Sequence, residues 1–268
     1  MKSHRPYIAV SGLASVSDAR LLCAIENNPS VEPRRLVGAV LVSRKTLQGK
    51  ATESLRYPSL AVAQEVCATL AAAPIVPAVH YNTRTNGGDI ERELFTLARH
   101  VPAMRMLQLN VVCPAVEAVE AFRRAHPWVE IVLQVSGETR AQYQSAGLNP
   151  WAVLADYGRV VDHLLLDLSR GTGRPLPVEA TADEIRLHEL QAETRHVGLG
   201  VAGGLGPDAR PVLGVLHGIL DEAVFARLSF DAESNLRVPA SHDFHLPGRD
   251  VLDAEKVRGY LQTFEGLP

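Results

Sequence analysis

Aromatic residues and cysteines are scarce in this sequence, and long apolar runs are absent. Aromatics make up 5% of the 268 residues, and the three cysteines, Cys23, Cys67 and Cys113, lie far apart. An odd number of widely spaced cysteines fits neither a disulfide framework nor a zinc motif, and favours reduced thiols. No apolar stretch reaches the roughly 20 residues of a membrane span. The opening MKSHRPYIAV lacks the apolar part of a signal peptide. We therefore expect a cytoplasmic protein that binds no membrane.

An excess of charge of either sign is also absent. The formal net charge is −3 at pH 7, so nothing predicts electrostatic capture of nucleic acid or of an anionic lipid surface. Hydrophobic residues make up 46% of the chain and charged residues 21%. This balance is typical of a domain of mixed helices and strands with a sizeable core. The sequence favours an enzyme-like domain, and it leaves open whether the chain is a monomer or a homodimer.

Short apolar runs recur along the whole chain, and helical patterns separate them. The runs predict buried strands at residues 7–10, 36–42, 75–79, 104–109, 129–135, 160–168, 197–202 and 226–231. Helices are expected to begin near Ser15 and to cover residues 58–73, 90–99, 116–125, 183–194, 209–216 and 255–264. Polar loops are expected at residues 43–56 and after the fifth strand. The alternation, without an internal linker, predicts one (β/α)₈ TIM barrel over residues 1–268. A doubly wound open sheet is the alternative.

The segment VGLGVAGGLGPDARP combines a strand, a glycine turn and the start of a helix. Its apolar run ends at Gly203-Gly204, and Pro207-Asp208 is typical of a first helical turn. Two glycines at a strand end let the backbone approach an anion, toward which the amides of the next helix point. The same residues also form tight turns that bind nothing, so the motif alone predicts either outcome.

Polar residues gather where the predicted strands end. A TIM barrel carries its active site on the loops after the strand carboxyl ends. The polar residues at these ends are Ser11, Arg56, His80, Asn82, Gln108, Asn110, Gln134, Asp167, Thr172 and Asp231. They are our candidates for chemistry.

Seven segments together resemble the phosphoribosylanthranilate isomerase family. VGLGVAGGLGPD is similar to the seventh-strand phosphate motif of that family, and HLLLDLSRGTGRPL to its sixth strand and the loop that follows. YIAVSGLASVSDARLL resembles its opening strand, ESLRYPSLAVAQEV the segment after its second strand, and MLQLNV its fourth strand. SFDAESNLR and the later LDAEKVRGYL resemble its last strand and closing helix. The segments occur in the family's order and touch nearly every part of the barrel.

The resemblance implies a reaction and a set of roles. The family isomerises a phosphoribosyl aminoaldose to the amino-ketose in tryptophan biosynthesis, without a metal or an organic cofactor. By position, Asp167 matches the general acid, and Arg56 matches an arginine that contacts the anthranilate part of the substrate. Asp231 matches an aspartate that ends the eighth strand. The remaining assignments are Gln108 and Asn110 as substrate contacts, and Gly171, Thr172, Gly173, Gly203 and Gly204 as phosphate binders.

Four positions depart from the family pattern. Ser11 stands where the family has its catalytic cysteine, and Ala9 replaces the lysine two residues earlier. Asn110 replaces a histidine. The phosphate-binding Ser-Ser-Gly of the eighth strand reads Glu233-Ser234-Asn235, in which Ser234 takes the serine position if the alignment shifts by one residue. An unassisted serine hydroxyl is too weak a base near neutral pH, and a carboxylate repels phosphate.

These departures lead to three hypotheses. The first is a divergent member that acts on a small phosphorylated sugar, with Asp167 as general acid and an altered base. The second is an inactive homologue that still binds a phosphorylated ligand. The third is a barrel enzyme for another small carbonyl or phosphosugar compound, which uses Asp167 with His80, since a histidine titrates in the useful range.

Several candidates also have plain structural interpretations. Asp167 could pair with Arg170 or Arg174, Arg56 could be a solvated surface residue, and His80 could be a satisfied core residue. In the segment SHDFH, His242 and His245 bracket an aspartate, which permits a metal site but is more often a solvated loop. No metal is therefore assigned. Cys113, after the fourth strand, could approach the mouth of the barrel.

Overall fold

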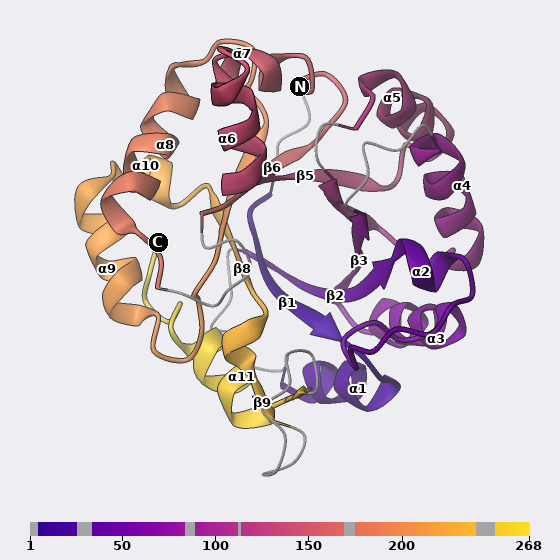
Figure 1. Cartoon of the computed structure of the whole chain (residues 1–268). Helices are drawn as coiled ribbons and strands as arrows, with labels where there is room; N and C mark the ends of the chain where they lie inside the picture. Colours follow the sequence, from indigo (N-terminus) through magenta and orange to yellow (C-terminus); the bar gives the residue numbers. More distant parts are fainter. Residues whose placement is uncertain (1–4, 26–33, 84–88, 112–113, 169–174, 240–249) are drawn as a thin grey trace.

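Eight parallel strands close into a barrel in the computed structural model of the chain (Figure 1). The structure describes residues 5–25, 34–83, 89–111, 114–168, 175–239 and 250–268. Each strand pairs with the next along the chain, and β8 returns to pair with β1 through Ile8 with Phe230 and Val10 with Ala232. The predicted TIM barrel is confirmed, and the open-sheet alternative is excluded because no barrel strand is left at an edge.

The strands lie where the apolar runs predict them, within a few residues. They are β1 (Tyr7–Leu13), β2 (Arg35–Ser43), β3 (Val76–Thr83), β4 (Met106–Val111), β5 (Glu130–Ser136), β6 (His163–Asp167), β7 (Gly198–Ala202) and β8 (Leu228–Ala232). The third strand runs on beyond its apolar stretch through His80, Tyr81 and Asn82, which continue the pairing with β4. The sixth begins later than predicted, because Val160 and Val161 belong to the preceding turn.

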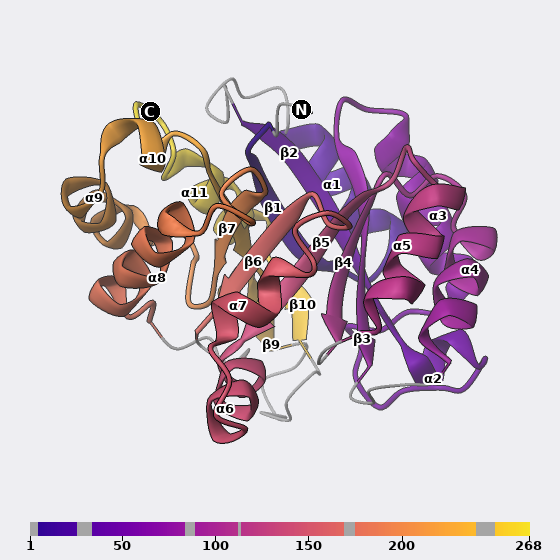
Figure 2. The same ribbon diagram turned by 90° about the horizontal axis from the view of Figure 1, so that it is seen from above.

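Helices surround the barrel on its outside, as Figure 2 shows. They are α1 (Val16–Ile25), α2 (Arg44–Leu47), α3 (Leu60–Ala71), α4 (Ile90–His100), α5 (Val116–Ala125), α6 (Gly137–Ser145), α7 (Pro150–Ala155), α8 (Val178–Leu190), α9 (Arg210–Ile219), α10 (Glu222–Phe225) and α11 (Ala254–Gln262). None of the helices in the described part of the chain has the length and apolar character needed to cross a membrane.

The polar loop predicted after the fifth strand is wrong, because two helices fill it. Helix α6 begins where the Ser136 hydroxyl accepts a hydrogen bond from the Thr139 amide, and α7 begins at Asn149, whose side chain caps the Trp151 amide. Helix α6 carries no apolar stripe, so its sequence lacks the helical periodicity on which the prediction depends. Its capping serine is the one local signal of a helix start.

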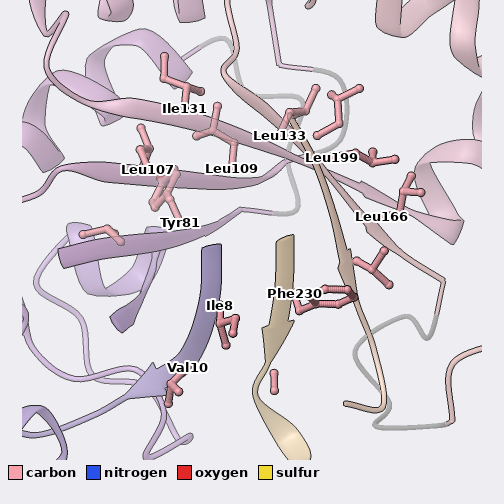
Figure 3. Packing of buried hydrophobic residues seen from close by; sticks show 14 of the residues in the cluster. Ile8, Val10, Tyr81, Leu107, Leu109, Ile131, Leu133, Leu166, Leu199 and Phe230 are labelled. Atoms are coloured by element: carbon pink, nitrogen blue, oxygen red, sulfur yellow. The ribbon is translucent and has the colours of Figure 1, made fainter. Parts of the chain in front are cut away.

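The buried residues form two layers, one inside the barrel and one between strands and helices. Side chains alternate along each strand, so Ile8 and Val10 of β1 face the outer layer while Tyr7 and Ala9 face the inner one. Figure 3 shows part of the outer layer, in which Val10, Tyr81 and Phe230 pack. The inner layer contains Tyr7, Ala9, Val37, Ala39, Ala78, Met106, Val132 and Leu165. The barrel is therefore filled, and any ligand must bind at one of its ends.

An antiparallel hairpin after β8 is an element that the sequence did not predict. A short 3₁₀ helix, η2 (Ser234–Leu236), leads into β9 (Arg237–Pro239), which pairs with β10 (Asp250–Leu252). Its strands are only three residues long, too short to show an alternating pattern. Several candidate residues lie outside the described part of the chain: His242, His245, Cys113, Arg170, Gly171, Thr172, Gly173 and Arg174.

Candidate functional site

The glycine turn after β7 has the conformation that its sequence predicts. Gly203 and Gly204 have φ angles of 105° and 68°, in the left-handed region that strains other residues. The strand, turn and helix follow in the predicted order, although α9 begins at Arg210 rather than at Pro207. The Asn235 side chain donates a 2.8 Å hydrogen bond to the Gly204 carbonyl, which joins the loops after β7 and β8.

A pocket opens at the carboxyl ends of the strands, beside this turn. The space between its walls is about 480 Å³ and includes open solvent. The residues that line it are Ser11, His80, Gln134, Leu165, Asp167, Ala202, Gly203, Gly204, Leu205, Asp231, Ala232, Glu233, Ser234 and Asn235. The fold therefore brings half of the strand-end candidates together in one lining, while Arg56, Asn82, Gln108 and Asn110 are not part of it.

Asp231 is a buried acid of the pocket, and hydrogen bonds hold its carboxylate from two sides. The Ser11 hydroxyl donates to its Oδ1 at 2.7 Å, and the Gln108 amide donates to its Oδ2 at 2.7 Å. Burial raises the pKa of Asp231 to about 6, against the opposing effects of Ser11, His80 and Gln108. The carboxylate is thus ionised at neutral pH, yet it accepts a proton more readily than an exposed aspartate does.

Gln108, which the sequence assigns to the substrate, lies beneath the pocket and connects two of its residues. It is fully buried on β4, directly beside His80 of β3. Its Oε1 lies 3.1 Å from His80 Nδ1, while its amide nitrogen bonds Asp231. Asn110 lies further along the same two strands, with its amide nitrogen 3.5 Å from His80 Nε2. These side chains form one continuous hydrogen-bonded chain.

Asp167 ends β6 and faces the pocket, as predicted. Its carboxyl group is 6% exposed, and its Oδ2 accepts a 2.9 Å hydrogen bond from the Gln134 side chain of β5. Gln134 leaves its own Oε1 buried without a hydrogen bond in the described structure. Gln134 lines the pocket, and a donor that reached this buried oxygen would satisfy it.

Arg56 binds the loop after β8 and is not a solvated surface residue. Its Nη1 lies 2.6 Å from Glu233 Oε1 and 3.2 Å from the Ser234 hydroxyl. Its Nε donates at 2.9 Å to Asp250, to which Nη2 also donates. The guanidinium therefore offsets the charge of Glu233, which reduces the phosphate repulsion expected from that carboxylate.

Arg237 and Asp250 complete this ion-pair network, which we call the clasp (Arg56, Glu233, Arg237 and Asp250). The Arg237 side chain is 1% exposed and donates to Asp250 Oδ1 at 2.7 Å and to the Gly12 carbonyl at 2.6 Å. Although burial opposes the effect, the two guanidinium groups hold the pKa of Asp250 below its ordinary value. Sequence reasoning missed both residues, because they belong to the unpredicted hairpin and no motif marks them.

The described part of the chain contains no cluster of three or more histidine, cysteine, aspartate or glutamate residues suited to a metal ion. The candidate pocket offers carboxylates, hydroxyls and backbone amides.

Comparison with known proteins shows the fold and no family. No family model matches the chain, and no curated protein matches its sequence. Among solved structures, an α-amylase from Lactobacillus plantarum has a TM-score of 0.55 at 10% identity, covering 99% of this chain and 80% of that one. A 3-keto-L-gulonate-6-phosphate decarboxylase from Vibrio cholerae O1 has a TM-score of 0.51 at 10% identity, covering 99% and 100%. A GH113 β-mannanase from Alicyclobacillus acidocaldarius has a TM-score of 0.52 at 10% identity, covering 100% and 99%. At these identities the likeness concerns the barrel alone.

Proposed function

We propose that this chain transfers a proton at the carbon next to the carbonyl or imine group of a small phosphorylated sugar. The reaction is an aldose-to-ketose isomerisation of the phosphoribosylanthranilate isomerase kind, with a carboxylate base in place of the cysteine. One observation carries the proposal: Asp167, Asp231 and the Gly203-Gly204 turn line the same pocket. Acid, base and anion-binding backbone are thus available to one ligand. The named sugar-processing neighbours, one of them acting on a phosphosugar, are compatible with this substrate class.

The phosphate is assigned to the turn after β7. Gly203 and Gly204 present backbone to the pocket without side chains, and Ser234 lies on the neighbouring loop after β8. Backbone amides in such turns bind phosphate oxygens well. Because Arg56 is paired with Glu233, the nearest carboxylate does not confront the phosphate as an uncompensated charge.

The base is assigned to Asp231 with Ser11 as its partner. The serine hydroxyl already donates to the carboxylate, so it orients the base rather than acting as one. A pKa of about 6 makes Asp231 ionised and still basic enough to remove an activated C–H proton. This accounts for the loss of the family's cysteine, because the proton acceptor lies on β8 instead of β1.

The acid is assigned to Asp167, which carries the same role in the family. It lies across the pocket from β1, on β6, and Gln134 fixes one of its oxygens. Protonation of the sugar ring oxygen by Asp167 opens the ring and exposes the C2 proton to Asp231. His80 and Glu233 also line the pocket close to Asp231.

The test is hydrogen exchange at C2 in D₂O, followed by NMR. Ribose 5-phosphate and N-(5-phosphoribosyl)anthranilate are the two substrates. Wild-type protein is expected to exchange or isomerise one of them, and Asp231→Asn and Asp167→Asn to lower the rate at least about 100-fold. Asp183→Asn, at an exposed helical position, is the control and should change nothing.

Three outcomes contradict the proposal in different ways. Binding of both phosphates without exchange indicates the inactive, ligand-binding homologue. If Asp167→Asn abolishes turnover while Asp231→Asn leaves it intact, the base is a group other than Asp231. Failure of both phosphates to bind removes the phosphosugar assignment altogether.

A further inference from the structure

The chain of side chains from Asn110 to Asp231 has a direction that its hydrogen bonds determine. An ionised Asp231 accepts hydrogen bonds only, so Gln108 turns its amide nitrogen toward the carboxylate. Its Oε1 then faces His80 Nδ1 at 3.1 Å and accepts, which requires the proton of His80 to be on Nδ1. The Nε2 atom is left as an acceptor facing Asn110. Every donor in the chain therefore points toward Asp231.

We propose that Gln108 is a positioning residue that couples residue 231 to His80, so that a hydrogen-bond donor in place of the ionised Asp231 carboxylate reverses the chain and moves the proton of a neutral His80 ring from Nδ1 to Nε2. The inference does not rest on the proposed function, because it is tested on the protein without ligand. It goes beyond that function by joining the pocket's base to a second titratable group through a residue that does not line the pocket.

In the reversed chain every donor again faces an acceptor, and the chain carries one more proton than before. A protonated Asp231 donates its O–H to Gln108 Oε1 after the amide has turned over. The Gln108 nitrogen then donates to His80 Nδ1, which must carry a lone pair, so the ring proton is on Nε2. Ser11 keeps its bond to Asp231 in both states. Because His80 Nε2–H then donates, Asn110 must turn its Oδ1 toward it, so the two states differ by two amide flips, one tautomer and one proton on the carboxyl group.

The surroundings of the chain contain few competing charges. Ser11, His80 and Gln108 act to lower the pKa of Asp231, and Glu233 acts to raise it. Tyr7 and Tyr260 also face this region, and burial raises the pKa of each phenol, so both stay neutral. Because burial also raises the pKa of Asp231 to about 6, its protonation falls in an accessible range of pH.

The test reads the His80 tautomer by two-bond ¹⁵N–¹H correlation in histidine-labelled protein, with His80→Gln to identify its signals. At about pH 8 the wild type is expected to show the Nδ1–H form. Asp231→Asn carries a permanent donor toward Gln108 and is expected to show the Nε2–H form at the same pH. In proteins that also carry Gln108→Leu, the His80 tautomer is expected to be the same whether residue 231 is aspartate or asparagine. Gln134→Leu, the equivalent change beside Asp167, is the control and should leave the His80 signals as in the wild type.

Two results overturn the inference. The first is an Nε2–H tautomer in the wild type at about pH 8, which contradicts the direction of the chain. The second is an unchanged Nδ1–H tautomer in Asp231→Asn, which shows that Asp231 and His80 are not coupled through Gln108. The Asp231→Asn comparison stands even if Gln108→Leu does not fold. A failure of the exchange reaction in D₂O changes neither result, so the two proposals fail separately.

Discussion

At the scale of single residues, burial decides what the carboxyl groups of the pocket can do. Asp231 belongs to β8 and Asp250 to β10, and their pKa values shift in opposite directions. Asp231 has neutral hydrogen-bond donors and a buried position, whereas Asp250 lies between two guanidinium groups. The first is suited to proton transfer and the second to holding the structure together.

The raised pKa of Asp231 predicts how stability depends on pH. Its folded value of about 6 exceeds the ordinary 3.8, so its contribution is complete below pH 3.8 and is lost as the pH rises through 6. Asparagine at position 231 does not titrate, so its own contribution to stability does not change with pH. The free energy of unfolding of Asp231→Asn, relative to wild type, should therefore rise by up to about 3 kcal/mol between acid and neutral pH. Urea unfolding across this range measures it, and a constant difference contradicts the assignment.

The same group predicts the pH dependence of turnover. Asp231 acts as a base only when ionised, so kcat/KM for the exchanged sugar phosphate should rise with pH and level off above about 6. A pH–rate profile measures this directly. A rate that falls through this range instead identifies a protonated group as the one required.

Sequence reasoning found these residues but not their connections. Asp167, Asp231 and His80 were found because polar residues at the carboxyl ends of barrel strands necessarily meet at one rim. Whether a strand-end side chain lines the pocket or is buried beneath it depends on strand register, which places Gln108 of β4 beside His80 of β3. Arg56 binds residues 177 and 194 positions away in the chain. Nothing local in the sequence specifies such partners.

At the scale of elements, the clasp fixes the rim of the pocket. Arg56 belongs to the segment between β2 and α3, Glu233 to the loop after β8, and Asp250 to the hairpin. Arg237 adds a bond to Gly12 at the end of β1, where a Cβ would lie 2.9 Å from its Nη1. Three separate segments and one strand end are thereby held in one arrangement.

Removal of the Asp250 carboxylate is predicted to destabilise all the segments that the clasp joins. Asp250→Ala leaves the buried Arg237 guanidinium without its carboxylate partner, which should cost roughly 2–4 kcal/mol of unfolding free energy. The matched control, Asp183→Ala, breaks an exposed pair with Arg186 and should cost under about 0.5 kcal/mol. Equal losses in the two variants would show that the clasp contributes no more than a surface ion pair.

The elements that sequence reasoning predicted are those with a strong local pattern. The eight strands have continuous apolar runs, and the glycine turn after β7 has a conformation that glycine alone adopts easily. Helix α6 and the β9–β10 pair lack any such periodicity. Both are stabilised by capping, pairing and distant charges, which a window of sequence does not display.

At the scale of the whole molecule, the two rims of the barrel have different tasks. The amino-terminal rim is tied by buried ion pairs and by Arg34, which is 1% exposed and donates to the Leu228 and Phe225 carbonyls. Near the start of β6, Arg123 donates to both oxygens of the buried Asp162, at 2.7 and 2.9 Å. The pocket lies at the opposite rim, as TIM barrels in general separate stability from function.

This separation predicts a variant that loses stability and keeps ligand binding. Arg123→Ala removes the guanidinium partner of the buried Asp162 carboxylate, which keeps its hydrogen bond from the Ile131 amide. The loss should cost roughly 3 kcal/mol of unfolding free energy. The affinity of this variant for ribose 5-phosphate should match that of the wild type below the unfolding transition. Calorimetry of both properties tests this, and a parallel loss of binding would contradict the separation.

The central claim is that the carboxyl rim binds a phosphate at the turn after β7. The most direct measurement is the amide ¹⁵N–¹H shifts of Gly203, Gly204 and Ser234 during titration with ribose 5-phosphate, with ribose as the control. We predict saturable shifts of these amides with the phosphorylated sugar and none with ribose. Shifts that are absent, or that are the same with both sugars, would contradict the claim.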